Sequence, residues 1–458
     1  MKRLNQRKIA FIFLFFIGIV GTGCEKYLDQ KSDQKLVVPT NGSDFQALLD
    51  NLTYMIGSPS SGEISSDDYY LTGSDYGLMA YDNYRRMHVW EKDNLFAPNE
   101  PENDWQYTYT TIYYANTVLN GLAAGNLTSA AHNNVKGQAY YYRGNAMLQA
   151  AQVWTMAYRD ATAHQEMGLP IKLNTNFNEQ SKRSTLAETY AQIIADLKKA
   201  VQLLPIVPVS KYRASKPAAY GVLARTYLVM GDYDKAYLYA DSCLQLYDRL
   251  IDYNSLNIAD AYPIQVNNAE VIHYKSLRSR DPIAVNYAKI NPEVYASYET
   301  NDLRKQAFFR LNTDNSFRFK GSYRGGSAQF SGIATNEILL IRAESAVRTD
   351  RITLGLADLN RLMANRYRKI NGVSTYIPVA LTSPADLLAN VLAERRKELL
   401  MRGLRWMDIK RLNVAGAGIS LSRTINGTVY TLPANDLRFA LPIPELVISL
   451  SGMEQNRR

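Results

Sequence analysis

Two pairs of carboxylates have the spacing that acid–base catalysis would need. Asp67 and Asp68 are adjacent, and Glu394 and Glu398 lie one helical turn apart. Paired carboxyl groups are what a glycoside hydrolase uses to protonate the leaving group and to activate its nucleophile. Glu398, however, stands four residues before Arg402, which is the spacing of a favourable helical ion pair. The second pair is therefore expected to be structural, whereas Asp67 and Asp68 could serve catalysis, cap a turn or bind calcium.

No further motif supports catalysis. The sequence has no glycine-rich phosphate loop, no G-x-S-x-G nucleophile elbow and no H-E-x-x-H zinc motif. Its four histidines, at positions 88, 132, 164 and 273, are scattered without metal-ligand spacing. We therefore expect the protein not to be an enzyme and to hold neither a cofactor nor a metal.

Cys24 is one of only two cysteines, and it ends an apolar run near the start of the chain. Basic residues between positions 2 and 8 precede an apolar stretch from Ile9 to Val20. This stretch is shorter than the roughly 20 residues of a membrane-spanning helix, and the order of basic, apolar and small residues is that of a secretory signal. A cysteine directly after the cleavage point is typical of a bacterial lipoprotein. We predict a signal peptide over residues 1–23, lipidation of Cys24 and a tether over residues 24–42; the alternative is a secreted protein in which Cys24 is incidental.

The composition is that of a large globular protein with an excess of tyrosine. Cleavage before Cys24 would remove four basic and no acidic residues, so the net charge would fall from +9 to +5. A net positive charge this small, without a stripe of basic residues, does not indicate nucleic-acid binding. The 33 tyrosines far exceed the 13 phenylalanines. Because tyrosine combines an apolar ring with a polar tip, this excess predicts a broad amphipathic surface.

Helical periodicity dominates the sequence and predicts a mostly α fold. Apolar and aromatic residues recur at three- and four-residue spacing over 105–122 and 137–154. A further helix is expected after a Ser184 or Thr185 cap, ending before Pro205. Residues 218–246 fit a tetratricopeptide-like helical hairpin, and residues 337–366 fit a second one more loosely. The small, aromatic and turn positions of the first hairpin are Ala224, Tyr227, Gly231, Tyr233, Ala236, Ala240 and Cys243.

Two irregular segments, at about 57–106 and 250–335, interrupt the helices. A stretch of this length inside a compact protein is usually functional or disordered, and the aromatic residues of the first one argue against disorder. A short helix is expected from Ser43, and "LSRTINGTVYTLP" predicts a β-hairpin that turns at Asn426-Gly427. We expect one domain over residues 43–458, with a scaffold of helical hairpins, two loop-rich insertions and a few short β-hairpins.

Several segments follow one another in an order found in one protein family. They are "GCEKYLDQ", "WQYTYTTIYYANTVL", "TYAQIIADLKKAVQLLP", "ASKPAAYGVLARTYLVMGDYDKAYLYA", "YETNDLR", "AERRKELLMRGLRWMDIKRL" and "LPIP" with "EQN". By these segments the chain resembles the SusD/RagB family of outer-membrane nutrient-binding lipoproteins over essentially its whole length. The most specific block contains Glu394, Arg395, Glu398, Leu399, Gly403, Arg405, Asp408 and Arg411, and its alternating charges are expected to tie the last helices into the scaffold. Arg402, Val447 and Ser451 depart from the family pattern.

The resemblance implies a function at the cell surface. Members of the family bind oligosaccharides, or sometimes peptides, and cover a SusC-like TonB-dependent outer-membrane transporter that imports the cargo. The resemblance therefore implies a glycan-binding lipoprotein that is anchored in the outer membrane, faces the cell exterior and delivers nutrient to such a transporter. Open alternatives are a peptide-binding lid of the same kind of transporter, a surface glycoside hydrolase that uses Asp67 or Asp68, and a scaffold that binds only proteins.

A sugar site needs an aromatic surface beside hydrogen-bonding groups. Trp105, Trp154 and Trp406 fall in predicted helices and are expected in the core, so Trp90 in the first insertion is the candidate stacking residue; the alternative is that it fixes its loop to the scaffold. The other candidates in the first insertion are Asp68, Tyr69, Tyr70, Tyr81, Tyr84, Arg85 and Asn94. In the second insertion they are Arg278, Asn286 and Tyr287.

Overall fold

The computed structural model describes residues 39–96, 103–380 and 383–458. All of its helices and strands lie in the compact unit Asn41–Arg458. The predicted signal peptide, Cys24 and nearly all of the predicted tether lie outside the described residues. No helix in the described part of the chain is long and apolar enough to cross a membrane.

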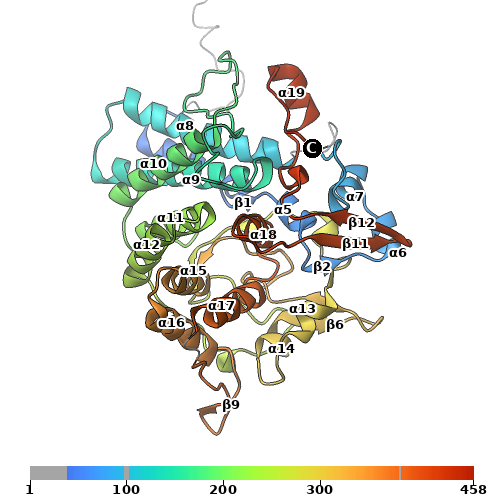
Figure 1. The fold of residues 1–458 in the computed structure, drawn as a ribbon. Helices are drawn as coiled ribbons and strands as arrows, with labels where there is room; N and C mark the ends of the chain where they lie inside the picture. Colours follow the sequence, from blue (N-terminus) through green and yellow to red (C-terminus); the bar gives the residue numbers. More distant parts are fainter. Residues whose placement is uncertain (1–38, 97–102, 381–382) are drawn as a thin grey trace, which may run out of the picture. The chain divides into compact units, whose positions relative to one another are not determined.

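Long helices pack against their neighbours along the chain and form the scaffold (Figure 1). α8 packs on α9, α9 on α10, α10 on α11, α11 on α12, α12 on α15, and α15 on both α16 and α17. The mostly α fold expected from the sequence is confirmed. The helices are α8 (Asp104–Ala124), α9 (Ala130–Trp154), α10 (Leu186–Leu203), α11 (Lys216–Met230), α12 (Tyr233–Leu246), α15 (Thr335–Arg348), α16 (Ile352–Ala364), α17 (Pro384–Glu398) and α18 (Arg405–Val414).

Local signals explain where these helices begin and turn. Thr185 caps α10, and its hydroxyl and Glu188 form a reciprocal capping box. The α11–α12 hairpin turns at Gly231, whose φ of 76° lies in the left-handed region that favours glycine. The two helices approach closely because small residues, among them Ala236 and Cys243, are fully buried between them. The predicted tetratricopeptide-like hairpin is therefore confirmed.

Short helices and strands fill the rest of the unit. The helix expected from Ser43 begins one residue earlier, because Asn41 accepts hydrogen bonds from the backbone N–H groups of Ser43 and Asp44. The helical elements are α3 (Gly42–Leu49), α4 (Leu52–Met55), α5 (Ser61–Ser65), α6 (Gly73–Gly77), α7 (Asp82–His88), η1 (Tyr253–Ser255), η2 (Asp281–Ile283), α13 (Pro292–Ala296), α14 (Arg304–Phe308), η3 (Leu437–Phe439) and α19 (Glu445–Ser451). Thus the first insertion, irregular in sequence, contains several short helices.

The strands form small two-stranded sheets. β1 (Gly57–Ser58) pairs with β4 (Ser276–Leu277), β2 (Tyr69–Tyr70) with β5 (Lys289–Ile290), β3 (Val271–His273) with β8 (Ile333–Ala334), β6 (Phe309–Leu311) with β7 (Phe317–Phe319), β9 (Lys369–Ile370) with β10 (Val373–Ser374), and β11 (Leu421–Ile425) with β12 (Thr428–Leu432). Asn426 and Gly427, with φ of 49° and 82°, make the predicted turn between β11 and β12.

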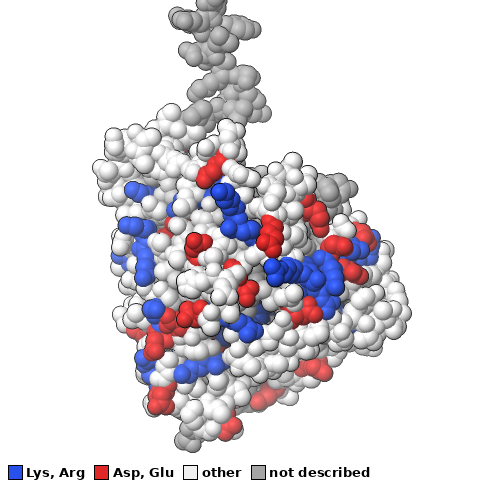
Figure 2. Space-filling view, turned by 45° about the horizontal axis from the view of Figure 1, so that its top comes forward, with Lys and Arg blue, Asp and Glu red and all other residues white. Residues whose placement is uncertain are grey.

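The core contains the aromatic residues that the helical pattern placed there. Trp105, Trp154 and Trp406 are buried, as predicted. Many tyrosines are buried as well, so the tyrosine excess serves the core as much as an amphipathic surface. On the face of the molecule shown in Figure 2, basic side chains lie next to acidic ones, in keeping with the mild net charge.

Candidate functional site

The two insertions meet in one surface region. β1 of the first insertion pairs in parallel with β4 of the second, and β2 pairs antiparallel with β5. The backbone N–H of Ala80 donates to the Asp281 carboxylate at 2.9 Å, and that of Asn291 donates to the Asp68 carbonyl at 3.0 Å. Candidate residues that lie about 200 positions apart in the sequence are thus held on backbone segments that are hydrogen-bonded to each other.

Trp90 lies in the core of this region. Its side chain is 2% exposed, its Nε1 donates to the Ser65 carbonyl at 2.9 Å, and the Arg423 guanidinium lies 4.7 Å from the ring centroid. The backbone at Trp90 has a φ of 59°, at the turn that follows α7. The indole is therefore not exposed for stacking, and the structure supports the alternative interpretation, in which Trp90 fixes its loop to the scaffold.

Tyr69 and Tyr84 also face inward. The Tyr69 hydroxyl donates to the Ile64 carbonyl at 2.9 Å and lies 3.2 Å from His88 Nδ1. Burial raises the pKa of Tyr69, so its hydroxyl stays protonated at neutral pH. Tyr84 is 5% exposed and packs edge-on against Tyr81, with 5.5 Å between the ring centroids. Both inward-facing rings support the region from inside.

The carboxylates of Asp67 and Asp68 accept hydrogen bonds from arginines. Asp67 accepts hydrogen bonds from Arg405 at 2.7 Å and from Arg396 at 3.0 Å, and Asp68 accepts one from Arg396 at 2.9 Å. Burial raises the pKa of Asp68; at Asp67 burial acts in the same direction, but the hydrogen bond from Arg405 and the nearby positive charges hold the pKa below its usual value. Carboxylates held in this way are poorly placed to bind calcium or to protonate a glycosidic oxygen.

Glu398 is ion-paired as well, although not with the partner expected from spacing. It contacts Arg366 at 2.7 Å and Arg304 at 3.1 Å, and all three side chains are fully buried. α17 ends at Glu398, and Met401 has a φ of 56°, so Arg402 is no longer on the helix. The predicted Glu398–Arg402 pair is therefore wrong, whereas a structural role for Glu398 is confirmed.

The remaining candidates are exposed to different degrees. Arg278 points inward, with its guanidinium over the Tyr107 ring. The Arg85 guanidinium donates to the Met79 carbonyl at 2.8 Å, and the backbone N–H of Asn94 donates to Glu445 of α19 at 2.8 Å. Partly or fully exposed are Tyr70, Tyr81, Arg85, Asn94, Asn286 and Tyr287.

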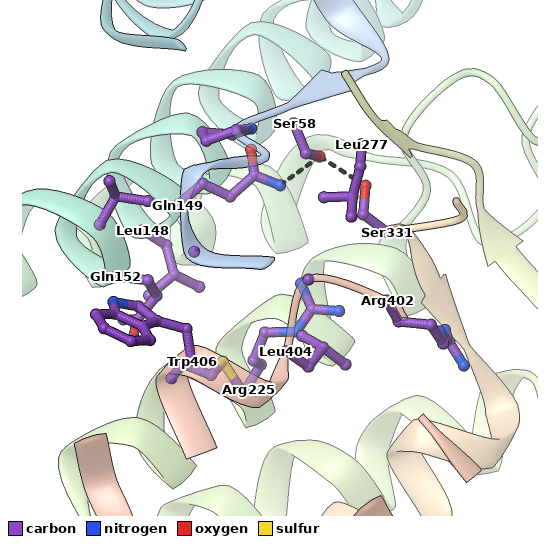
Figure 3. A pocket seen from close by; sticks show the side chains of 15 residues that line it. Ser58, Leu148, Gln149, Gln152, Arg225, Leu277, Ser331, Arg402, Leu404 and Trp406 are labelled. Atoms are coloured by element: carbon purple, nitrogen blue, oxygen red, sulfur yellow. Dashed lines mark hydrogen bonds between the residues drawn. The ribbon is translucent and has the colours of Figure 1, made fainter. Parts of the chain in front are cut away.

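An interior pocket lies between α9, α5 and the start of α18 (Figure 3). On one wall Gln149 donates to the Ser58 hydroxyl at 2.9 Å, and the Ser331 hydroxyl donates to it at 2.8 Å. Arg402 and Trp406 come from the opposite wall. The volume is about 50 Å³, which suits a few water molecules but is far below the roughly 300 Å³ at which ligand sites begin. The interior pocket is therefore too small for a sugar ring.

A larger cavity, called here the β6–β7 depression, opens beside the hairpin formed by β6 and β7. Its volume is about 350 Å³, within the range of ligand sites. Most of the side chains in its walls are polar. One of them, Lys289, forms an ion pair with Asp75, with 2.6 Å between the Lys289 Nζ and the carboxylate. The lining residues are Asn286, Lys289, Arg310, Leu311, Asn312, Thr313, Asp314 and Arg318.

Tyr70 is the aromatic residue that strand register assigns to the side of this depression. Tyr70 is opposite Lys289 in the β2–β5 ladder, whereas Tyr69 is opposite Ile290. Directly opposed residues project from the same face of a sheet, and their Cβ atoms lie about 5 Å apart. Asn286 is the sequence candidate that lines this cavity, and Tyr70 is a partly buried neighbour of the lining residue Lys289.

Seven of the eight lining residues, all except Asn286, escaped the sequence reasoning. A signal for six of them was present in "FRLNTDNSFRF" (309–319), where two short alternating runs flank a polar turn. For Lys289 no such signal existed, because its place follows from pairing with β2.

Comparisons with known proteins agree on one family. Residues 26–228 match the SusD-like family described as "Starch-binding associating with outer membrane". The SusD-like protein P38 of Formosa agariphila is 20% identical over 93% of this chain and 95% of its own length. The SusD-like protein P2 of the same organism is 24% identical over 77% and 79%. The chain is similar to SusD-like proteins over most of its length, and residues 26–228 match the family itself.

Solved structures extend this likeness to the whole SusD-like fold. A putative sugar-binding protein of Bacteroides vulgatus has a TM-score of 0.74 at 20% identity, over 92% of this chain and 99% of that one. A SusD superfamily protein of Bacteroides thetaiotaomicron has a TM-score of 0.73 at 21% identity, over 91% and 100%. At these identities the structures establish the fold of this SusD-like chain, and its binding residues must be argued from its own surface.

Proposed function

We propose that this SusD-like protein binds an oligosaccharide in the β6–β7 depression and delivers it to a TonB-dependent outer-membrane transporter. The proposal includes lipidation at Cys24, which would hold the protein on the outer face of the membrane. It is supported by the match of residues 26–228 to a family described as starch-binding and associated with the outer membrane. The observation that carries it is the depression itself, because it combines a suitable volume with amide, hydroxyl and charged groups.

The chemistry of the depression suits a sugar. A pyranose ring has apolar faces and polar edges, so it needs an aromatic plate and convergent hydrogen-bonding groups. Tyr70, which is opposite the lining residue Lys289, would supply the plate, and the amides of Asn286 and Asn312 can each donate and accept. The carboxylates that could have supported hydrolysis, Asp67 and Asp68, are held by Arg396 and Arg405, which favours binding over catalysis.

The test is calorimetric titration of the soluble form, beginning at Glu25, with a panel of oligosaccharides. Tyr70→Ala is expected to weaken binding roughly five- to tenfold, since a ring contact contributes on the order of 1 kcal/mol. Asn286→Ala should also weaken it. The matched control is Asn94→Gly, which removes an exposed amide outside the depression and keeps the positive φ of 51° accessible. Binding that is lost equally in the control, or that responds only to peptides, would contradict a glycan site in the depression.

Delivery to a transporter requires a separate experiment. The full-length protein should co-purify from outer membranes with a TonB-dependent transporter. Deletion of the gene for that transporter should abolish uptake of the bound glycan while leaving its binding to the soluble protein unchanged. Uptake that continues without the transporter would contradict this part of the proposal.

A further inference from the structure

The β6–β7 hairpin places two arginines directly opposite each other. Arg310 and Arg318 are register partners, and both line the depression. Like charges in directly opposed positions destabilise a sheet. Such a pair therefore needs an explanation that the hairpin alone does not give.

The other face of the hairpin fixes this arrangement. Phe309 and Phe319 are paired and buried, at 5% and 6% exposure, and Phe317 stacks on Tyr295 with 3.6 Å between the ring centroids. Because side chains alternate along a strand, this apolar face obliges both arginines to project from the opposite face. A slip of the register by one residue would turn the apolar face of one strand to solvent, exposing either Phe309 or both Phe317 and Phe319, so the arginines cannot move apart.

The arginines are not neutralised by the rest of the protein. Neither Arg310 nor Arg318 forms an ion pair or a hydrogen bond with any of the residues that the structure describes. The nearby acids are already engaged: Asp75 binds Lys289 at 2.6 Å, and Asp314 lies 3.9 Å from Lys289 and accepts hydrogen bonds from Ser316. Three cations, those of Lys289, Arg310 and Arg318, thus line the depression against the single lining acid Asp314.

We infer that the glycan bound in the depression is anionic and that Arg310 and Arg318 bind its carboxylate or sulfate groups. A guanidinium presents a planar fork of donors that matches an oxyanion in a bidentate manner. An oxyanion between the two side chains would remove their mutual repulsion and gain charge-assisted hydrogen bonds. This inference rests on the proposed glycan-binding function and names its substrate class, a glycan that contains uronic acid or sulfate ester groups.

The experiment compares matched ligands in calorimetric titration of the soluble protein. One arm uses oligogalacturonides and the same chains with their carboxyl groups reduced; the second uses sulfated galactan oligosaccharides and their desulfated counterparts. At least one acidic ligand should bind tenfold or more tightly than its neutral counterpart. The arm that responds identifies the carboxylate or the sulfate as the recognised group. Binding should also weaken as the salt concentration rises, because the contacts are charged.

The variants assign the effect to the hairpin. Arg310→Gln combined with Arg318→Gln is expected to weaken acidic ligands by at least tenfold, and Arg310→Lys with Arg318→Lys by an intermediate amount because charge remains but the fork is lost. The control, Arg249→Gln with Arg457→Gln, removes the same charge from exposed positions elsewhere and should leave affinity unchanged. Without ligand, Arg310→Gln alone should raise the melting temperature, since it relieves the repulsion.

Failure of the inference and failure of the proposed function give different results. Binding of a neutral glycan that ignores both arginine substitutions would overturn the inference and leave the proposed function intact. Binding of no glycan of either kind would overturn both. Equal loss of acidic-ligand affinity in the control variant would also overturn the inference, because net charge and not the hairpin would then be responsible.

Discussion

The Arg366 guanidinium donates to the Glu398 carboxylate at 2.7 Å, and neither side chain has any exposed surface. Glu398 also accepts from Arg304, which binds Glu394 at 2.6 Å, so α17 is joined to the backbone around both arginines. Charges buried this deeply stabilise only when every partner is present. Glu394 and Glu398 of α17 are therefore part of a buried ionic framework.

Glu398→Ala is expected to lower the free energy of unfolding by about 3–5 kcal/mol, because it removes the anion that the buried guanidinium groups of Arg304 and Arg366 share. Urea-induced unfolding of the soluble form measures this directly. Glu454→Ala is the control: its pair with Arg457 is exposed, and we expect a change below about 1 kcal/mol. Similar values for the two variants would contradict the framework role of Glu398.

The contribution of Glu63 to the stability of the protein should fall as the pH rises. Burial, together with the negative charges of Asp68 and Asp67, raises the pKa of Glu63 to about 8, from about 4.5 in an accessible glutamate. The folded state holds this proton more tightly than the unfolded state, so the contribution is most favourable below pH 4.5 and is lost between pH 4.5 and 8.

Glu63→Gln isolates that effect, because the amide cannot ionise and the other titrating groups are unchanged. The free energy of unfolding of the natural protein, relative to that of Glu63→Gln, should decline by several kcal/mol from pH 5 to pH 8. Parallel pH profiles for the two proteins would show that Glu63 ionises normally in the folded state.

Trp90→Phe should reduce stability without reducing the affinity for glycan. The substitution removes the Nε1 hydrogen bond to Ser65 and part of a buried ring, so a loss of about 1–3 kcal/mol in unfolding free energy is expected. Titration with the glycan identified for the natural protein provides the second readout. A folded Trp90→Phe protein with affinity lowered as much as in Tyr70→Ala would restore Trp90 as a ligand contact.

Cys24→Ala tests the anchor predicted from the sequence. The variant should incorporate no labelled palmitate and should leave the membrane fraction. Cys243→Ala serves as the control, since Cys243 is fully buried between α11 and α12 and has no role in anchoring. Labelling that persists in Cys24→Ala would contradict acylation of Cys24 and would indicate a different acylation site.

The helices and the family were predictable from the sequence because their determinants are local. The cap of α10 is specified by Thr185 and Glu188, which are three residues apart. The turn between α11 and α12 is specified by Gly231, which separates two segments of helical apolar periodicity. The core tryptophans followed from the same periodicity.

The site was less predictable because its geometry depends on distant pairing. Trp90 is buried by Ser65 and by Arg423, which lies more than 300 positions further along the chain. Tyr70 lies opposite the lining residue Lys289 only because β2 pairs with β5. Arg310 and Arg318 lie on strands of three residues each, which are too short for alternation to stand out.

The pairing of β1 with β4 and of β2 with β5 also sets an order of events during folding. Residues 57–70 cannot complete their strands until residues 276–290 have been made and have closed a loop of more than 200 residues. The early helices α8 to α12 can consolidate inside that loop from local contacts. The region that carries the proposed site is thus expected to be among the last parts to fold, and a chain truncated before residue 276 would form the early helical hairpins but not the β2–β5 pairing.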